Sequence, residues 1–173
     1  MITSGKAALA TATLTFAALA APLALAAPAQ ADPLSGTCSG GQISFNTNPI
    51  GLSTSPVKAA VTGNLSGCQG TPSSAGTVKA DFAGTGSCFD VNGTVDGVIA
   101  WADGQRSTFS GPYDVPGGAG APKTNTVAIT GGPGAGQQLT VSQAALNGAS
   151  LVGPCLSDSA DNASVAITSA QFG

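Results

Sequence analysis

The chain has 173 residues, of which 8% are charged, and its formal net charge is −3. All the acidic residues are aspartate, histidine is absent, and the basic residues are scattered along the chain. This composition excludes a basic patch for nucleic acid, a zinc site with histidine ligands and a Ser-His-Asp triad.

The first 31 residues have the features of a signal peptide. Lys6 precedes an apolar run at 7–27, and Ala29-Gln30-Ala31 places small residues at the positions that signal peptidase reads. Cleavage would leave 32–173 as one β domain of 142 residues (173 less 31). We therefore expect a secreted, extracellular protein with no membrane attachment after cleavage.

Strand-forming and turn-forming residues dominate this domain, and glutamate, a good helix former, is absent. Apolar residues alternate with polar ones at Ile43 and Phe45, and again from Val57 to Leu65. This pattern predicts two paired strands around a loop at 48–56.

The stretch 78–111 predicts three antiparallel strands. Asn92-Gly93 is typical of a two-residue hairpin turn, and such a turn pairs Gly84 with Trp101 and gives the indole ring room. Even-numbered residues before the turn then share a face with odd-numbered residues after it. This face is apolar: Val78, Ala80, Phe82, Gly84, Gly86 and Cys88, with Val95, Ile99 and Trp101.

The same parity argument selects the next turn. A three-residue loop at 102–104, with Gly104 in the left-handed conformation, places Phe109 on the face of Trp101, which we expect to be a core residue. Gly97 lies inside the middle strand, where we expect either a bulge or close packing.

The second half of the chain predicts further strands around Val127, Leu139 and Val165, with a long irregular stretch at 112–123. Asn147-Gly148 predicts another hairpin, joining 142–146 to 149–152. About nine strands in sequential hairpins favour an all-β, single antiparallel domain, either a meander β-barrel or a β-sandwich. An immunoglobulin-like Greek-key sandwich is the alternative.

Four cysteines in an exported chain predict two disulfides, with three possible connectivities. Pairing of the first two strands brings Cys38 close to Cys68. Cys68 and Cys88 lie at opposite ends of the third strand, too far apart for a bond that needs Cα atoms within about 7 Å. The favoured pairs are therefore Cys38–Cys68 and Cys88–Cys155.

The residues give little support for catalysis or metal binding. Asp90 and Asp96 flank the predicted turn, and Asp158 and Asp161 lie in a polar loop, but each pair fits ordinary turn chemistry better than an active site. No catalytic residue, cofactor site or metal site is predicted.

Two residues are candidates for an exposed contact. Arg106 follows the second turn, and Tyr113 opens the long loop, where binding residues tend to lie. A Tyr113 ring packed beneath the loop is the equally favoured alternative.

Three stretches resemble uncharacterised small secreted β-rich proteins of actinobacteria: Gly63-Asn-Leu-Ser-Gly-Cys68, Gly84-Thr-Gly-Ser-Cys88 and Ile99-Ala-Trp-Ala-Asp-Gly104. That resemblance implies export and a β fold, and no function. Ile99-Ala-Trp101 with 107–113 is also loosely similar to a streptavidin hairpin, and 156–162 to the apoproteins of the neocarzinostatin type. The single tryptophan and the long disulfide loops depart from those two families.

We therefore expect a secreted non-catalytic protein, an extracellular binding or interaction module whose partner is a protein, a glycan or a small molecule. An inhibitor of a secreted hydrolase is one version of it. The alternatives are an Asp-dependent polysaccharide hydrolase, which needs two carboxylates in a wide cleft, and a small-molecule carrier, which needs an apolar cavity of several hundred Å³, on the order of 300 or more.

Overall fold

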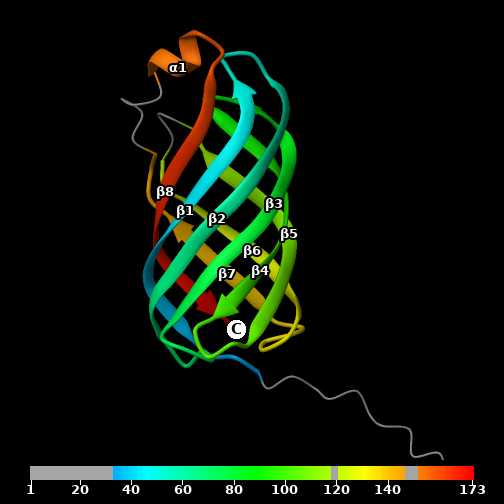
Figure 1. Cartoon of the computed structure of the whole chain (residues 1–173), viewed down its shortest axis with the longest axis vertical. Helices are drawn as coiled ribbons and strands as arrows, with labels where there is room; N and C mark the ends of the chain where they lie inside the picture. Colours follow the sequence, from blue (N-terminus) through cyan, green and yellow to red (C-terminus); the bar gives the residue numbers. More distant parts are fainter. Residues whose placement is uncertain (1–32, 118–120, 147–151) are drawn as a thin grey trace, which may run out of the picture.

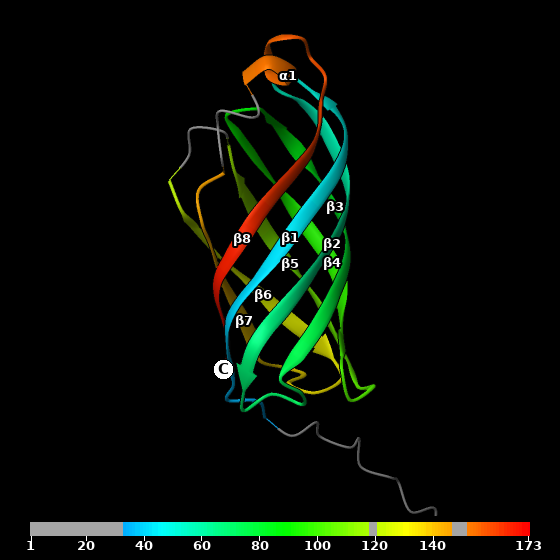
Figure 2. The ribbon, with the colours of Figure 1, turned by 60° about the vertical axis from the view of Figure 1, so that its left-hand side comes forward.

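The computed structural model describes residues 33–117, 121–146 and 152–173. In them, eight strands form a closed barrel in which each strand is antiparallel to the next in the sequence and the last pairs with the first (Figures 1 and 2). The strands are β1 (Thr37–Ile50), β2 (Ser55–Gln69), β3 (Ala75–Ser87), β4 (Asp90–Trp101), β5 (Arg106–Pro116), β6 (Lys123–Gly131), β7 (Gln138–Gln143) and β8 (Ala160–Phe172), with one short helix, α1 (Val152–Leu156), before β8.

The barrel confirms the all-β, single antiparallel meander fold and decides between barrel and sandwich. The Greek-key alternative is wrong, because every strand pairs with its neighbours in sequence except where β8 closes on β1. Closure gives every strand a paired neighbour on each side. In the described ranges, no helix is long and apolar enough to cross a membrane.

The described residues contain eight strands against the expected nine, and the difference falls at the predicted hairpin of 142–146 with 149–152. β7 ends at Gln143, and Val152 begins α1. The Asn147-Gly148 turn itself lies outside the described residues, as does the predicted signal peptide at 1–31.

Alternation along the strands fills the barrel with apolar side chains. One residue in two points inward, as the burial pattern of β6 shows at Asn125, Val127 and Ile129. The main buried cluster runs the length of the barrel and includes Ile43, Phe45, Val61, Leu65, Val78, Phe82, Val95, Ile99, Trp101, Phe109, Leu139, Val141, Val165, Ile167 and Phe172.

The predicted turn at Asn92-Gly93 is wrong. The β3–β4 ladder continues to the pair Ser87↔Asp90, so the chain turns at 88–89 and Gly84 faces Gly93. Gly93 serves close packing instead, because a Cβ atom there would lie 2.7 Å from Gly84 Cα and 2.7 Å from the tip of the Phe82 ring. The two faces of the strands were nevertheless predicted correctly. Gly84 was expected to pair with Trp101 and pairs instead with Gly93, eight residues away. A register shift by an even number of residues leaves each side chain on the same face of the sheet.

The second turn is confirmed. Trp101 N donates to Gln105 O at 2.9 Å around a three-residue loop, and Gly104 has φ +93°. Trp101 and Phe109 are both buried. Gly97 is a close-packing site with unbroken pairing on both sides.

The structure contains both favoured disulfides. Cys38 and Cys68 are direct partners in the β1–β2 ladder, with Cα atoms 3.8 Å apart. Cys88, in the β3–β4 turn, is bonded to Cys155 of α1, with Cα atoms 5.9 Å apart. The second bond fixes α1 against one end of the barrel, which is the end that carries the candidate site.

Candidate binding site at the α1 end of the barrel

The predicted contact residues do not form a site. Arg106 is exposed, but it begins β5 at the end of the barrel far from α1. Tyr113 as an exposed contact is wrong, since it is only 6% exposed and its ring lies 6.4 Å from that of Phe45. The reason is that β5 continues to Pro116, so the first five residues of the predicted irregular stretch at 112–123, Tyr113 among them, are barrel wall.

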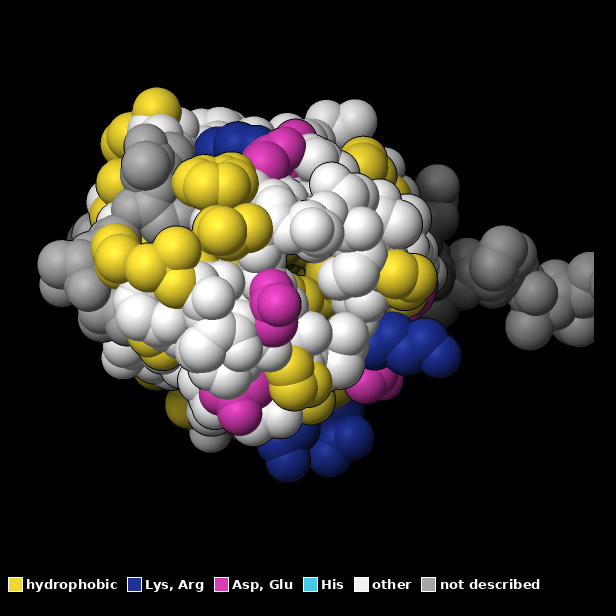
Figure 3. Space-filling model, turned by 90° about the horizontal axis from the view of Figure 1, so that it is seen from above, with side chains coloured by type: hydrophobic (Ala, Val, Ile, Leu, Met, Phe, Trp, Pro, Cys, Tyr) yellow, Lys and Arg dark blue, Asp and Glu magenta, His cyan; other side chains and the backbone are white. Residues whose placement is uncertain are grey.

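The α1 pole, defined here as α1 with the turns at 51–54 and 88–89, gathers the exposed large hydrophobic side chains of the described residues. Leu52, Phe89, Val152 and Leu156 are 46–67% exposed. Figure 3 looks onto this pole and shows hydrophobic side chains around a small central hollow. We call these four residues the rim. A cluster of exposed apolar side chains at one place is typical of an interaction surface.

At the same pole, beside residues adjacent in sequence to the rim, lies an apolar recess of about 50 Å³. It leads into the barrel, and by volume it accommodates about three to five water-sized groups. The Cys88–Cys155 disulfide forms part of its wall. The remaining wall is mostly apolar and includes Phe45, Ile50, Val57, Phe82, Val91 and Val115. We call the recess and its opening the mouth.

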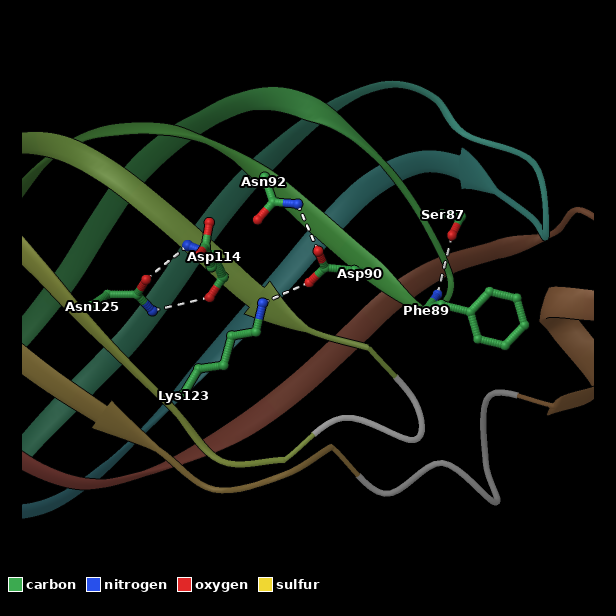
Figure 4. A network of polar contacts seen from close by, with 7 residues as sticks. All are labelled: Ser87, Phe89, Asp90, Asn92, Asp114, Lys123 and Asn125. Carbon is green, nitrogen blue, oxygen red and sulfur yellow. Dashed lines mark hydrogen bonds and ion pairs between the residues drawn. The ribbon is translucent and has the colours of Figure 1, made fainter.

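On one side of the mouth, side-chain hydrogen bonds connect β5 and β6 where the two strands have no backbone pairing. β5 and β6 pair only through Thr108, Phe109 and Ser110 of β5, and the strands then separate toward the α1 pole. There the Asn125 side chain accepts a hydrogen bond from Asp114 N at 2.8 Å and donates one to Asp114 O at 3.0 Å (Figure 4). Asn125 therefore bridges β5 and β6 where their backbones no longer meet.

An ion pair reinforces the same side. Lys123 Nζ lies 2.6 Å from Asp90 Oδ1, and Asn92 donates to the other carboxylate oxygen at 2.7 Å (Figure 4). The hydrogen bond from Lys123, and then that from Asn92, lowers the pKa of Asp90. Phe89, a rim residue, directly precedes Asp90 in the chain, so this ion pair lies next to the rim.

Below the recess, the barrel interior contains a smaller apolar cavity of about 30 Å³, lined by Tyr113 with Ile43, Val78, Phe109, Val141 and Ile167. Among the described residues, the buried polar side chains besides Tyr113 are Ser87, Ser107, Asn125 and Gln143, and none is charged. Burial raises the pKa of Tyr113 above its ordinary value, so its hydroxyl stays protonated.

The structure does not bring together the aspartates that the sequence suggested as a pair. Asp90 and Asp96 lie six residues apart on β4, and Asp90 is engaged by Lys123. Asp81 faces Asp96 across β3–β4, but on the outer wall, beside an open depression with Lys58. In the described residues, no three His, Cys, Asp or Glu side chains group to hold a metal ion.

Comparisons with known proteins give no family to guide the assignment: no protein-family model matches the chain, and no curated protein matches it. The mouth was also missed from sequence. One signal of it in the sequence is that a large apolar residue follows each of Cys88 and Cys155, namely Phe89 and Leu156.

Proposed function

We propose that this protein is a secreted, non-catalytic interaction module, and that it binds an extracellular protein through the mouth. The observation that carries the proposal is the apolar recess at the same pole as the four exposed hydrophobic side chains of the rim. Protein interfaces of this kind place one anchor side chain in a central pocket and surround it with contacts that exclude water.

The dimensions favour a protein partner over a carried small molecule. Drug-sized ligands occupy about 300–1,000 Å³, whereas the recess measures about 50 Å³. A recess of that size suits a single side chain, and the rim provides apolar surface well beyond it. The two disulfides fit an oxidising compartment, which agrees with the leader predicted at 1–31.

The test is capture of partners from the culture medium of the source organism by immobilised mature protein. In one variant, Phe89→Ser and Leu156→Ser are combined; both residues are more than 60% exposed, so the fold should tolerate the change. The control combines Gln105→Ser and Arg106→Ser at the opposite end. Loss of two apolar rim contacts, at about 1 kcal/mol each, should weaken binding by about thirtyfold.

The expected result is a partner that the wild type and the control retain and the rim variant loses. Equal retention by all three proteins would place the interface elsewhere and reject the mouth. Turnover of a polysaccharide that Asp81→Asn or Asp96→Asn abolishes would instead favour the hydrolase alternative.

A further inference from the structure

Three polar atoms in the barrel interior are buried and meet no hydrogen-bonding partner among the described residues. They are Tyr113 Oη and both side-chain polar atoms of Gln143, Oε1 and Nε2. Gln143 is 1% exposed and Tyr113 is 6% exposed. Nearly all buried polar atoms in proteins are paired, so three in one small barrel call for a partner.

These atoms lie between the recess and the inner cavity. Tyr113 lines the inner cavity, while the next inward residue of β5, Val115, lines the recess. Phe45, whose ring packs on Tyr113, also lines the recess. The two rings therefore separate the two spaces.

Gln143 lies on β7, on the other side of β6, one inward position nearer the α1 pole than Val141, the partner of Asn125. It follows Val141 on the inward face of β7, and its partner on β8 is Ile167; both neighbours line the inner cavity. Leu146, three residues further along the chain, lines the recess. A group that passes through the recess would therefore come first to the part of β7 that carries Gln143, and then to Tyr113.

The chemistry of this floor selects a neutral group that both donates and accepts hydrogen bonds. Gln143 provides one acceptor and two donors, and the Tyr113 hydroxyl provides both functions. No buried side chain among the described residues is charged, so a charged group entering the floor would lose its hydration without a counter-ion. Among neutral side chains with such a tip, tyrosine has the longest apolar stem.

From these observations we infer that the anchor group received by the mouth is a tyrosine side chain of the partner, with its ring in the recess and its hydroxyl bonded to Tyr113 Oη and the Gln143 amide. The inference rests on the proposed function. It requires the Phe45 and Tyr113 rings to part, which joins the recess to the inner cavity; together they hold about five to eight water-sized groups.

The probes are 4-methylphenol and toluene, the side-chain analogues of tyrosine and phenylalanine. They differ by the hydroxyl alone. Calorimetric titration of the mature wild-type protein should give at least tenfold tighter binding of 4-methylphenol, because one additional satisfied hydrogen bond is worth about that factor. Tyr113→Phe and Gln143→Met keep the size of each side chain and should each reduce the preference toward unity.

The same two variants give a readout without any probe. If these polar atoms are unpaired in the unliganded protein, replacing them with apolar groups removes a cost of burial. Each variant should then raise the thermal midpoint of the unliganded protein by about 2–5 °C. A lowered midpoint in both variants would mean that buried water alone satisfies these atoms, and would overturn the inference.

Competition separates this inference from the proposed function. 4-methylphenol should displace the captured partner, and toluene should not do so at the same concentration. Equal binding of both probes, or binding of 4-methylphenol without displacement, would reject the tyrosine anchor while the rim variants still support the interface. If neither probe binds and the rim variant retains the partner, both proposals fail.

Discussion

A methyl group added at Gly97 tests whether the packing of the β3–β4–β5 wall is as tight as the structure indicates. A Cβ atom at Gly97 would lie 2.4 Å from Ala80 Cβ, 2.6 Å from Phe109 Cζ and 2.8 Å from Lys79 O. Carbon atoms in contact are optimally about 3.5–4.0 Å apart. Gly97→Ala therefore requires the neighbouring strand and the Phe109 ring to move.

Two opposing effects set the magnitude. Overpacking a core costs about 1–3 kcal/mol, and replacing glycine by alanine in extended backbone returns about 0.4–1 kcal/mol through the unfolded state. We expect a net loss of about 1–2 kcal/mol in the free energy of unfolding. In an Ala80→Gly background the loss should shrink by about 0.5–1.5 kcal/mol, because the closest contact is gone.

The assay is chemical denaturation followed by the fluorescence of Trp101, the single tryptophan, which is 3% exposed. Gly40→Ala is the matched control, since a Cβ atom at Gly40 lies no closer than 3.5 Å to another residue. That variant should be neutral or slightly more stable than the wild type. A Gly97→Ala protein as stable as Gly40→Ala, at an unchanged denaturant slope, would refute the reasoning.

Three further outcomes are expected. Ser107→Ala removes the acceptor of the Trp101 indole N–H, 3.0 Å away, in a fully buried position, and should lower the free energy of unfolding by about 1–3 kcal/mol; a loss below that of an exposed serine variant would contradict it. Asp90→Asn breaks the ion pair with Lys123 and should cost at most about 1 kcal/mol at neutral pH, because the pair is half exposed. Since the pKa of Asp90 is lowered in the folded state, this difference should fade as the pH falls below the ordinary value of 3.8, and a difference that persists in acid would exclude the ion pair as its cause. Serine at both cysteines of the α1 disulfide, whose sequence separation is 67 residues, should cost about 4 kcal/mol, measured by thermal unfolding; an unchanged midpoint would rule out that contribution.

Parity explains why the faces of the central meander were predictable while its turn was not. Asn92-Gly93 is a strong turn signal, but Gly84 and Gly93 let β3 and β4 approach closely and give the Phe82 ring its place. Extending the ladder to Ser87↔Asp90 adds backbone hydrogen bonds that a turn at 92–93 would forgo. Long-range packing thus outweighs the local preference, and the even displacement leaves the buried set unchanged.

The candidate site was less predictable because it depends on contacts between distant segments. Phe89 and Leu156 read as ordinary apolar residues until the disulfide brings the β3–β4 turn and α1 to one pole. Asn125 and Gln143 lie at inward positions of strands whose alternation is otherwise apolar. Polar residues at such positions are the sequence signal that was available, and they mark the bridged strands and the floor of the mouth.

The closing contact between the first and last strands makes the barrel a ring. Thr37 pairs with Gln171, and Phe172 N donates to Gly36 O, so the described chain enters and leaves the barrel at the pole opposite α1. A fusion partner or a surface attached at either end of the barrel would therefore lie at the pole opposite the rim and leave the rim accessible. The same adjacency allows circular permutation: a short linker between the termini, with new ends opened in the 70–74 turn, would preserve every strand pairing.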